Sequence, residues 1–226
     1  MEIEEKLNRI LVTPKSDENI HPSKPGSFKE AIADTSEKAY QRAILFGRST
    51  ILNDKPNQQV HWYDIELPVV LNKNSRRPCI DLIGHDSRRF VLCELKFGNN
   101  KSDSPIAAVR ELLEYYRLII INSKYLDQYK IHHKNSICNE HTWNWASILE
   151  NIPLILIAAN EGYWKHWRKT TTIDYEDQLK QIKLWSNELG LDIALYETKD
   201  YDFKSQRNNK PSYWPKLEIL MNHGFV

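Results

Sequence analysis

The 226-residue sequence has little cysteine, almost no excess charge and no long apolar run. Its three cysteines show no framework spacing, and Cys79 and Cys93 fall in apolar segments, which predicts free thiols in a reducing compartment. With 31 basic and 30 acidic side chains, no overall field attracts polyanions, so any contact with nucleic acid must come from a local patch. The longest apolar runs, near 118–121 and 153–159, are far shorter than a membrane span.

The amino-terminal stretch Met-Glu-Ile-Glu-Glu-Lys is too charged for a signal peptide, so we expect a cytoplasmic protein. The length suits one domain with its own core. Residues 1–26 combine a short candidate helix with several prolines and Gly26, a composition that predicts an arm or linker. Residues 27–226 are then expected to form the single domain.

The spacing of apolar residues predicts an α/β chain with alternating elements. We expect helices near 27–46, 105–121 and 174–189, strands near 60–71, 78–84, 90–97, 153–159 and 191–197, a loop over 49–59, and a short helix near 216–221. The three adjacent strands favour an antiparallel meander, and the strand–helix–strand units after them favour parallel pairing. A mixed central sheet flanked by helices on both faces is therefore expected.

Two of the predicted strands carry an acidic residue inside an apolar run: Asp81 in one and Glu94 in the other. Burying a charge is costly unless it has a partner or a metal. Because strand side chains alternate, Glu94 and Lys96 should project from the same face. Two carboxylates and an ammonium brought together across a hairpin could hold a divalent cation and bind a phosphate. The structural alternative is a buried Glu94–Lys96 ion pair stabilised by Asp81.

Asp81, followed thirteen residues later by Glu94-Leu95-Lys96, resembles the core motif of the PD-(D/E)XK nuclease superfamily, which has the restriction-endonuclease-like fold. That family carries an acid on its second core strand and (D/E)-x-K on the third. The residue before Asp81 is Ile80 rather than proline, which is a departure from the literal motif.

Two flanking helices extend the resemblance. Glu111 and Tyr115 resemble the family's Gln-x-x-x-Tyr pattern, with Glu in place of Gln, and the resemblance implies that they contact nucleic acid. Glu37, on the preceding helix, fits the place of an acid that the family often carries there. From the residues alone, Glu37 is either a third acid that faces the site or an acid at the edge of an apolar stripe.

The resemblance implies a DNA nuclease that depends on Mg²⁺ or Mn²⁺. Asp81 and Glu94 would hold the ion, with the Leu95 carbonyl and Glu37 as further ligands, and Lys96 would orient the attacking water. The products would carry a 5′-phosphate and a 3′-hydroxyl. The alternative is a catalytically weak or inactive nucleic-acid-binding subunit of a larger assembly. An RNA-directed nuclease is a further alternative, and a second copy of the chain or another protein is the expected partner.

Three groups of residues outside the motif are candidate binding sites. Arg76 and Arg77 flank the acids and either contact phosphates or merely aid solubility. In the segment 163–169, Trp164, Lys165 and Arg168 either stack on bases and neutralise phosphates or pack under a loop. The zinc-type residues between 132 and 141 match no standard finger spacing. They are His132, His133, Cys138 and His141.

Overall fold

The computed structural model describes nine segments of the chain, and the structural statements below concern these segments. They are residues 2–11, 37–46, 49–52, 59–69, 79–98, 103–128, 143–170, 174–199 and 216–222.

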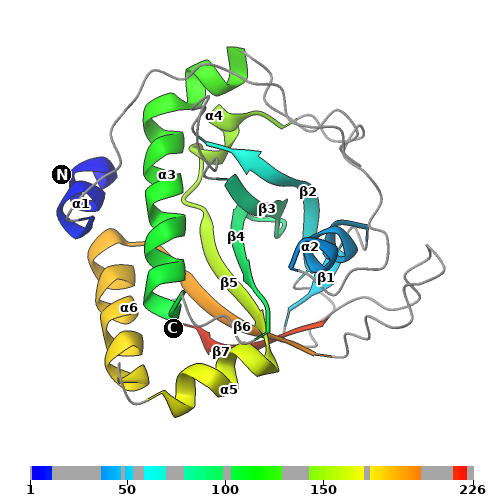
Figure 1. Ribbon diagram of the computed structural model, residues 1–226. Helices are drawn as coiled ribbons and strands as arrows, with labels where there is room; N and C mark the ends of the chain where they lie inside the picture. Colours follow the sequence, from blue (N-terminus) through cyan, green and yellow to red (C-terminus); the bar gives the residue numbers. More distant parts are fainter. Residues whose placement is uncertain are drawn as a thin grey trace, which may run out of the picture.

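A seven-stranded sheet forms the centre of the protein, and its strands follow one another across the sheet in chain order (Figure 1). The elements are α1 Ile3–Ile10, α2 Glu37–Phe46, β1 Ser49–Ile51, β2 Gln59–Pro68, β3 Cys79–His85, β4 Phe90–Lys96, α3 Pro105–Gln128, α4 Trp145–Ile148, β5 Leu154–Asn160, α5 Glu161–Lys169, α6 Tyr175–Leu189, β6 Ile193–Lys199 and β7 Lys216–Asn222. Strands β1 to β4 pair antiparallel, β4, β5 and β6 pair parallel, and β7 is antiparallel to β6. The sheet curls, so that β7 comes near β1.

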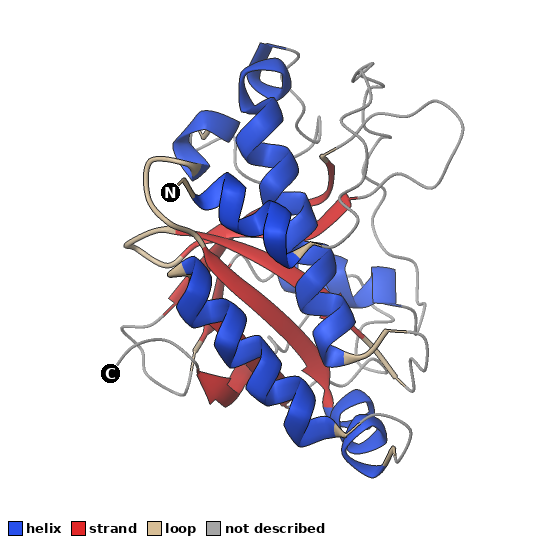
Figure 2. Cartoon of the chain, turned by 90° about the vertical axis from the view of Figure 1, so that its left-hand side faces the viewer, coloured by secondary structure: helices blue, strands red, loops and turns tan. Residues whose placement is uncertain are grey.

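Helices cover both faces of this sheet. On one face α3 and α6 lie across the strands, joined by α1, α4 and α5 in one apolar cluster, and Figure 2 views this side. On the other face α2 packs through Tyr40, Ile44 and Leu45 against a second cluster. Strand β5 contributes to both clusters because its continuous apolar run is buried on both sides. The α/β class, the mixed sheet and the helices on both faces are thereby confirmed.

Several local predictions hold and others are wrong. Helix α6 ends at Gly190, which has φ +66° and is the C-cap, as the sequence predicted. The predicted helix near 216–221 is wrong: this segment forms β7 on the edge of β6. The predicted loop over 49–59 contains β1, and α3 continues beyond 121 to Gln128.

The prediction of an arm over residues 1–26 is wrong for its first part. Leu7 and Leu11 are fully buried in the cluster around α3, and the Arg117 side chain of α3 donates a hydrogen bond to Asn8. Helix α1 therefore belongs to the packed body, because its apolar residues meet a surface that lies more than a hundred positions away in the chain. Residues 12–26 lie outside the described segments.

Within the described segments, none of the helices combines the length and the apolar composition that a membrane crossing requires.

Gly84 is expected to tolerate no side chain. It pairs with Trp62 across β2 and β3, and a Cβ there would lie 2.6 Å from the His61 carbonyl oxygen and 2.7 Å from Cγ1 of Val60. The strands would have to separate, so Gly84→Ala should lower the free energy of unfolding by about 1–3 kcal/mol, measured by urea unfolding.

Gly162→Ala on α5 is the matched control for Gly84→Ala. A Cβ at position 162 would meet no atom closer than 3.6 Å, and alanine is the better helix former. This variant should keep or raise the stability, by up to about 1 kcal/mol. Equal stability of the two variants would contradict the close approach at Gly84.

Candidate functional site

The candidate site lies where β3 and β4 separate. Their ladder ends at the pair Leu82–Cys93, whereas β4 goes on pairing with β5 as far as Lys96. Just past that last pair, Oδ2 of Asp81 accepts a hydrogen bond from the backbone nitrogen of Leu95, at 2.8 Å. The Asp81 carboxylate thus accepts the hydrogen bond that a backbone carbonyl of a neighbouring strand would otherwise accept. This hydrogen bond to the backbone of β4 holds Asp81 at the fork.

Helix α2 contributes two further groups. Gln41 donates from Nε2 to Oδ1 of Asp81. One turn earlier, Glu37 accepts the backbone N–H of Phe97 and lies close enough to Lys96 for the charges to interact. The structure therefore brings Glu37 beside the predicted site, half-buried at the first turn of its helix.

Glu94 and Lys96 project from the same face of β4, as predicted, and form an ion pair with 2.7 Å between Oε1 and Nζ. Both are buried, with 5% and 4% of their surface exposed. Lys96 Nζ also lies 3.5 Å from Oδ2 of Asp103 and 3.7 Å from Oε2 of Glu111. The second oxygen of Glu94, Oε2, has no hydrogen-bond partner among the described residues.

This concentration of acids shifts the pKa values of the site. Burial raises the pKa of Asp81 to about 8, even though the Leu95 N–H favours the charged form. Burial, and after it the charge of Asp81, raises the pKa of Glu94 well above its usual range. Burial alone would lower the pKa of Lys96, but Glu94 and the other acids outweigh it and raise that pKa. The negative charge of these carboxylates exceeds the single positive charge of Lys96. Binding of a proton or a cation would reduce this excess.

Without metal, the free energy of unfolding is expected to fall as the pH rises from about 4 to about 8. The pKa of Asp81 is raised from 3.8 to about 8, so over this range the folded protein keeps a proton that the unfolded chain has released. Raising the pH therefore favours unfolding. The stability that the Asp81 proton contributes is lost completely above about pH 8, where Asp81 is ionised in both the folded and the unfolded protein. The raised pKa values of Glu94 and Glu37 act in the same direction.

Urea unfolding in the presence of a chelator measures this dependence. Asp81→Asn lacks the titrating group, so its stability should fall less steeply between pH 5 and pH 8 than that of the unaltered protein. Parallel curves for the two proteins would contradict a raised pKa at Asp81.

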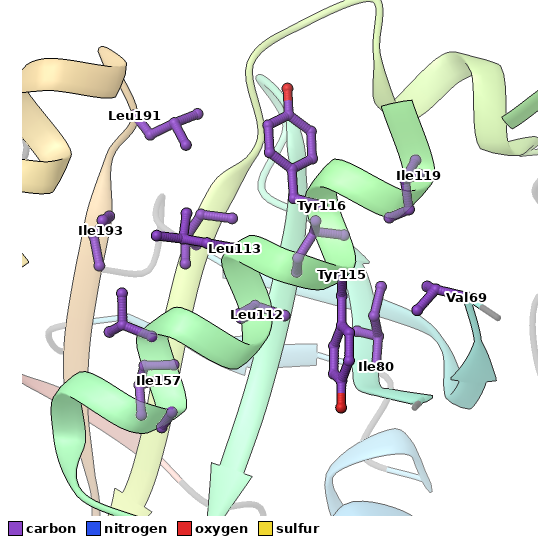
Figure 3. Packing of buried hydrophobic residues seen from close by; sticks show 14 of the residues in the cluster. Val69, Ile80, Leu112, Leu113, Tyr115, Tyr116, Ile119, Ile157, Leu191 and Ile193 are labelled. Atoms are coloured by element: carbon purple, nitrogen blue, oxygen red, sulfur yellow. The ribbon is translucent and has the colours of Figure 1, made fainter. Parts of the chain in front are cut away.

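Helix α3 supplies the pair Glu111 and Tyr115. The Tyr115 hydroxyl donates to Oε1 of Glu111, which confirms that these positions meet one turn apart. The Tyr115 ring is 3% exposed, and Figure 3 shows it among the apolar side chains of the core, with its hydroxyl pointing away from that of Tyr116. A direct contact of the ring with nucleic acid, which the sequence predicted, does not fit this position. Tyr115 instead holds Glu111 near Lys96.

The turn after β4 is tied to the start of α5. Gly98, with φ +68°, donates its N–H to Oδ1 of Asn160, the N-cap residue of α5, at 3.1 Å. The Tyr163 hydroxyl donates to the backbone carbonyl of Asp103 at 2.8 Å. These contacts keep the segment that carries Asp103 against Lys96.

Sequence reasoning missed Asp103 and Gln41 as members of the site. Asp103 directly precedes Ser104, which caps α3 by accepting the N–H of Ala107. A signal for Gln41 existed: it lies four residues after Glu37 and so shares its helix face. No comparable local signal marks Asp103.

The basic and aromatic segment at 163–169 lies in α5. For this segment, the predicted base stacking is wrong, whereas the predicted binding of phosphates stays a prediction. Trp164 is fully buried, with Nε1 donating to the carbonyls of Ala159 and Tyr196, so stacking on a base is wrong for this residue. Lys165 and Arg168 are exposed, and Lys165 pairs with Glu161 at 2.7 Å. Binding of phosphates by these two cations stays a prediction.

Other predicted residues fall outside the described segments. Arg76 and Arg77 are among them, as are the four zinc-type residues between 132 and 141.

The fork between β3 and β4 is a candidate site for a divalent ion. The described segments contain no group of three or more His, Cys, Asp or Glu side chains arranged to hold a metal. Mg²⁺, however, commonly binds to proteins through one or two carboxylates and keeps several waters. Asp81 and Glu94 supply two carboxylates, and Oε2 of Glu94 is buried without a partner. This donor set fits a partly hydrated Mg²⁺ or Mn²⁺ and does not fit a closed zinc site.

Comparison of the chain with known protein families, with curated proteins and with solved structures finds no match. Any functional assignment must therefore come from the chemistry of the site.

Proposed function

We propose that the protein is a Mg²⁺- or Mn²⁺-dependent nuclease that hydrolyses phosphodiester bonds in DNA. The observation that carries this proposal is the convergence at the fork between β3 and β4 of the Glu94–Lys96 ion pair and Asp81, whose charge interacts with both. The antiparallel run β2–β4, followed by α3 and the parallel strand β5, supports the restriction-endonuclease-like fold as part of the same proposal.

The purely structural alternative, a buried ion pair, accounts less well for the site. A Glu94–Lys96 pair alone would be neutral and need no further acid. Instead Asp81 and Glu111 act on both groups, Oδ2 of Asp103 lies 3.5 Å from Lys96 Nζ, and the pKa of Glu94 is pushed well upward. Replacing buried ion pairs by apolar residues is often neutral or stabilising, so an acid excess of this kind is better explained by a ligand than by stability.

Each residue has a role in hydrolysis. When bound, the divalent ion supplies positive charge to the scissile phosphate and acidifies a water molecule. Asp81 and Glu94 hold the ion, and Glu37 and the Leu95 carbonyl are further candidate ligands. The Lys96 ammonium orients the attacking water and stabilises the negative charge that develops on the phosphate.

DNA is the proposed substrate because the resemblance implies it and because α5, whose N-cap is tied to the turn after β4, carries exposed cations. Asn160, the N-cap residue of α5, binds the turn after β4, and the helix presents Lys165 and Arg168 to solvent. Such side chains contact the phosphates of a bound strand. Cys79 and Cys93 carry reduced thiols rather than a disulfide, which fits a reducing compartment, and the cytoplasm is the proposed location.

A plasmid-nicking assay tests the proposal. Supercoiled DNA should become nicked with Mg²⁺ or Mn²⁺ and stay intact with a chelator, while calorimetry reports binding of the ion. A labelled RNA strand, assayed in parallel, tests the RNA-directed alternative. Absence of both ion binding and cleavage would overturn the assignment.

A second candidate is a nucleic-acid-binding subunit that keeps the site but has little activity. The favouring observation is that Lys96 lies among three carboxylates, those of Glu94, Asp103 and Glu111, which compete with a phosphate for its charge. Ion binding without nicking, together with retained affinity for DNA, would favour this candidate.

A further inference from the structure

Gln41 is a buried polar side chain that the resemblance does not assign. It lies on α2, one turn after Glu37, and only 4% of it is exposed. Its Nε2 donates to Oδ1 of Asp81, whereas its Oε1 has no hydrogen-bond partner among the described residues. Around it, α2 packs through apolar side chains, so an apolar residue would have sufficed to fill the space.

The orientation of the amide follows from its neighbour. When a bound cation keeps Asp81 ionised, a turned-over amide would place its oxygen against an oxygen of Asp81, and two acceptors would repel each other. The nitrogen then faces Asp81, which leaves the buried oxygen without a partner among the described residues. A buried acceptor without a donor bears its full desolvation penalty, so a donor from outside the described residues is expected there.

Asp81 is held from two sides. Gln41 binds Oδ1 and the Leu95 N–H binds Oδ2, so the carboxylate cannot rotate about its last bond without losing one of the two. Each carboxylate oxygen keeps a further lone pair for a cation. Partners that fix the direction of a ligand are as much a part of a metal site as the ligands themselves.

We propose that Gln41 is a positioning residue of the cation site, which fixes the Asp81 carboxylate through Nε2 and accepts a hydrogen through Oε1 from a water of the bound ion. This inference rests on the proposed function, since it requires that a hydrated divalent ion binds next to Asp81. Mg²⁺ keeps several waters when bound, and those waters provide the missing donor.

Gln41→Met tests the inference, because methionine has a similar length but neither donor nor acceptor. The dissociation constant for Mn²⁺ or Mg²⁺, measured by calorimetry, should rise about 10- to 100-fold. The metal concentration for half-maximal nicking should rise by the same factor, while the rate at saturating metal stays within about threefold. A merely structural role would lower the active fraction at every metal concentration and leave the affinity of the folded protein unchanged.

Thr50→Val is the matched control. Thr50 accepts the indole N–H of Trp62 at 2.7 Å on the same side of the sheet, so this variant also removes a buried hydrogen bond. It should lose stability without any change in metal affinity. If Gln41→Met does not fold, Gln41→Asn, which withdraws the amide by one methylene, carries the same expectation.

The calorimetry distinguishes a failure of the inference about Gln41 from a failure of the proposed metal site. If the unaltered protein binds the ion and Gln41→Met binds it equally well, the inference about Gln41 is overturned and the proposed function stands. If the unaltered protein binds no divalent ion in calorimetry, the proposed metal site fails and the role of Gln41 fails with it.

Discussion

Lys96→Met is expected to reduce metal-dependent nicking of DNA by about two to three orders of magnitude. The Lys96 ammonium is buried and 2.7 Å from Glu94, so it acts in a setting where water screens little of its charge. Methionine fills nearly the same space but cannot stabilise the developing charge or orient a water. Asp81→Ala should be equally inactive, because it removes one of the two carboxylates at the fork.

The matched control is Lys180→Met. Lys180 pairs with Asp177 at 2.9 Å on the exposed side of α6, so the same substitution is made on a solvated ion pair. Exposed pairs contribute little, and neither activity nor stability should change measurably. Circular dichroism should show the same secondary structure in all variants, since Glu94 can take up a proton when its partner is lost. Cleavage by both Lys96→Met and Asp81→Ala at the rate of the unaltered protein would contradict the nuclease assignment.

Trp164→Ala is expected to lower the free energy of unfolding by about 3–5 kcal/mol. The indole is fully buried, its N–H donates to two backbone carbonyls at 3.1 Å each, and its ring meets Tyr163 edge to face with 5.0 Å between centroids. Alanine would leave a cavity at the junction of β5, β6 and α5. Thermal unfolding should shift downward by on the order of 10 °C.

Lys165→Ala separates packing from binding at α5. Lys165 is exposed beside Trp164 in the chain, and its pair with Glu161 is solvated, so the thermal unfolding of this variant should be almost unchanged. Its affinity for DNA, and that of Arg168→Ala, is the proper measure of a binding role for this helix. Trp164→Ala with unaltered stability would contradict the buried position of the indole.

The features that could be predicted from the sequence are those that neighbouring residues determine. The run at 153–159 is apolar without interruption, and it forms a strand that is buried on both faces. Asp174 and Gly190 bound α6 as its N-cap and C-cap. Because side chains alternate along a strand, two positions of β4 sufficed to place Glu94 and Lys96 on one face.

Wrong predictions concern segments whose conformation depends on distant partners. Residues 216–222 form a strand because they pair with β6, and α1 is packed because Leu7 and Leu11 meet the cluster around α3. Trp164 points inward because two carbonyls from neighbouring strands accept its N–H. None of these partners lies within one helical turn in the chain, so the local pattern of residues does not contain them.

The candidate site shows the same division. Residue types and their alternation mark Asp81, Glu94 and Lys96 as an acidic pair with a cation, without any coordinates. Only the packing of α2 and α3 against the sheet brings Gln41 to Asp81, and Glu111 to Lys96, and only the end of the β3–β4 ladder frees the Leu95 N–H for Asp81. These contacts join elements far apart in the sequence, and the burial that they create raises the pKa values of the acids.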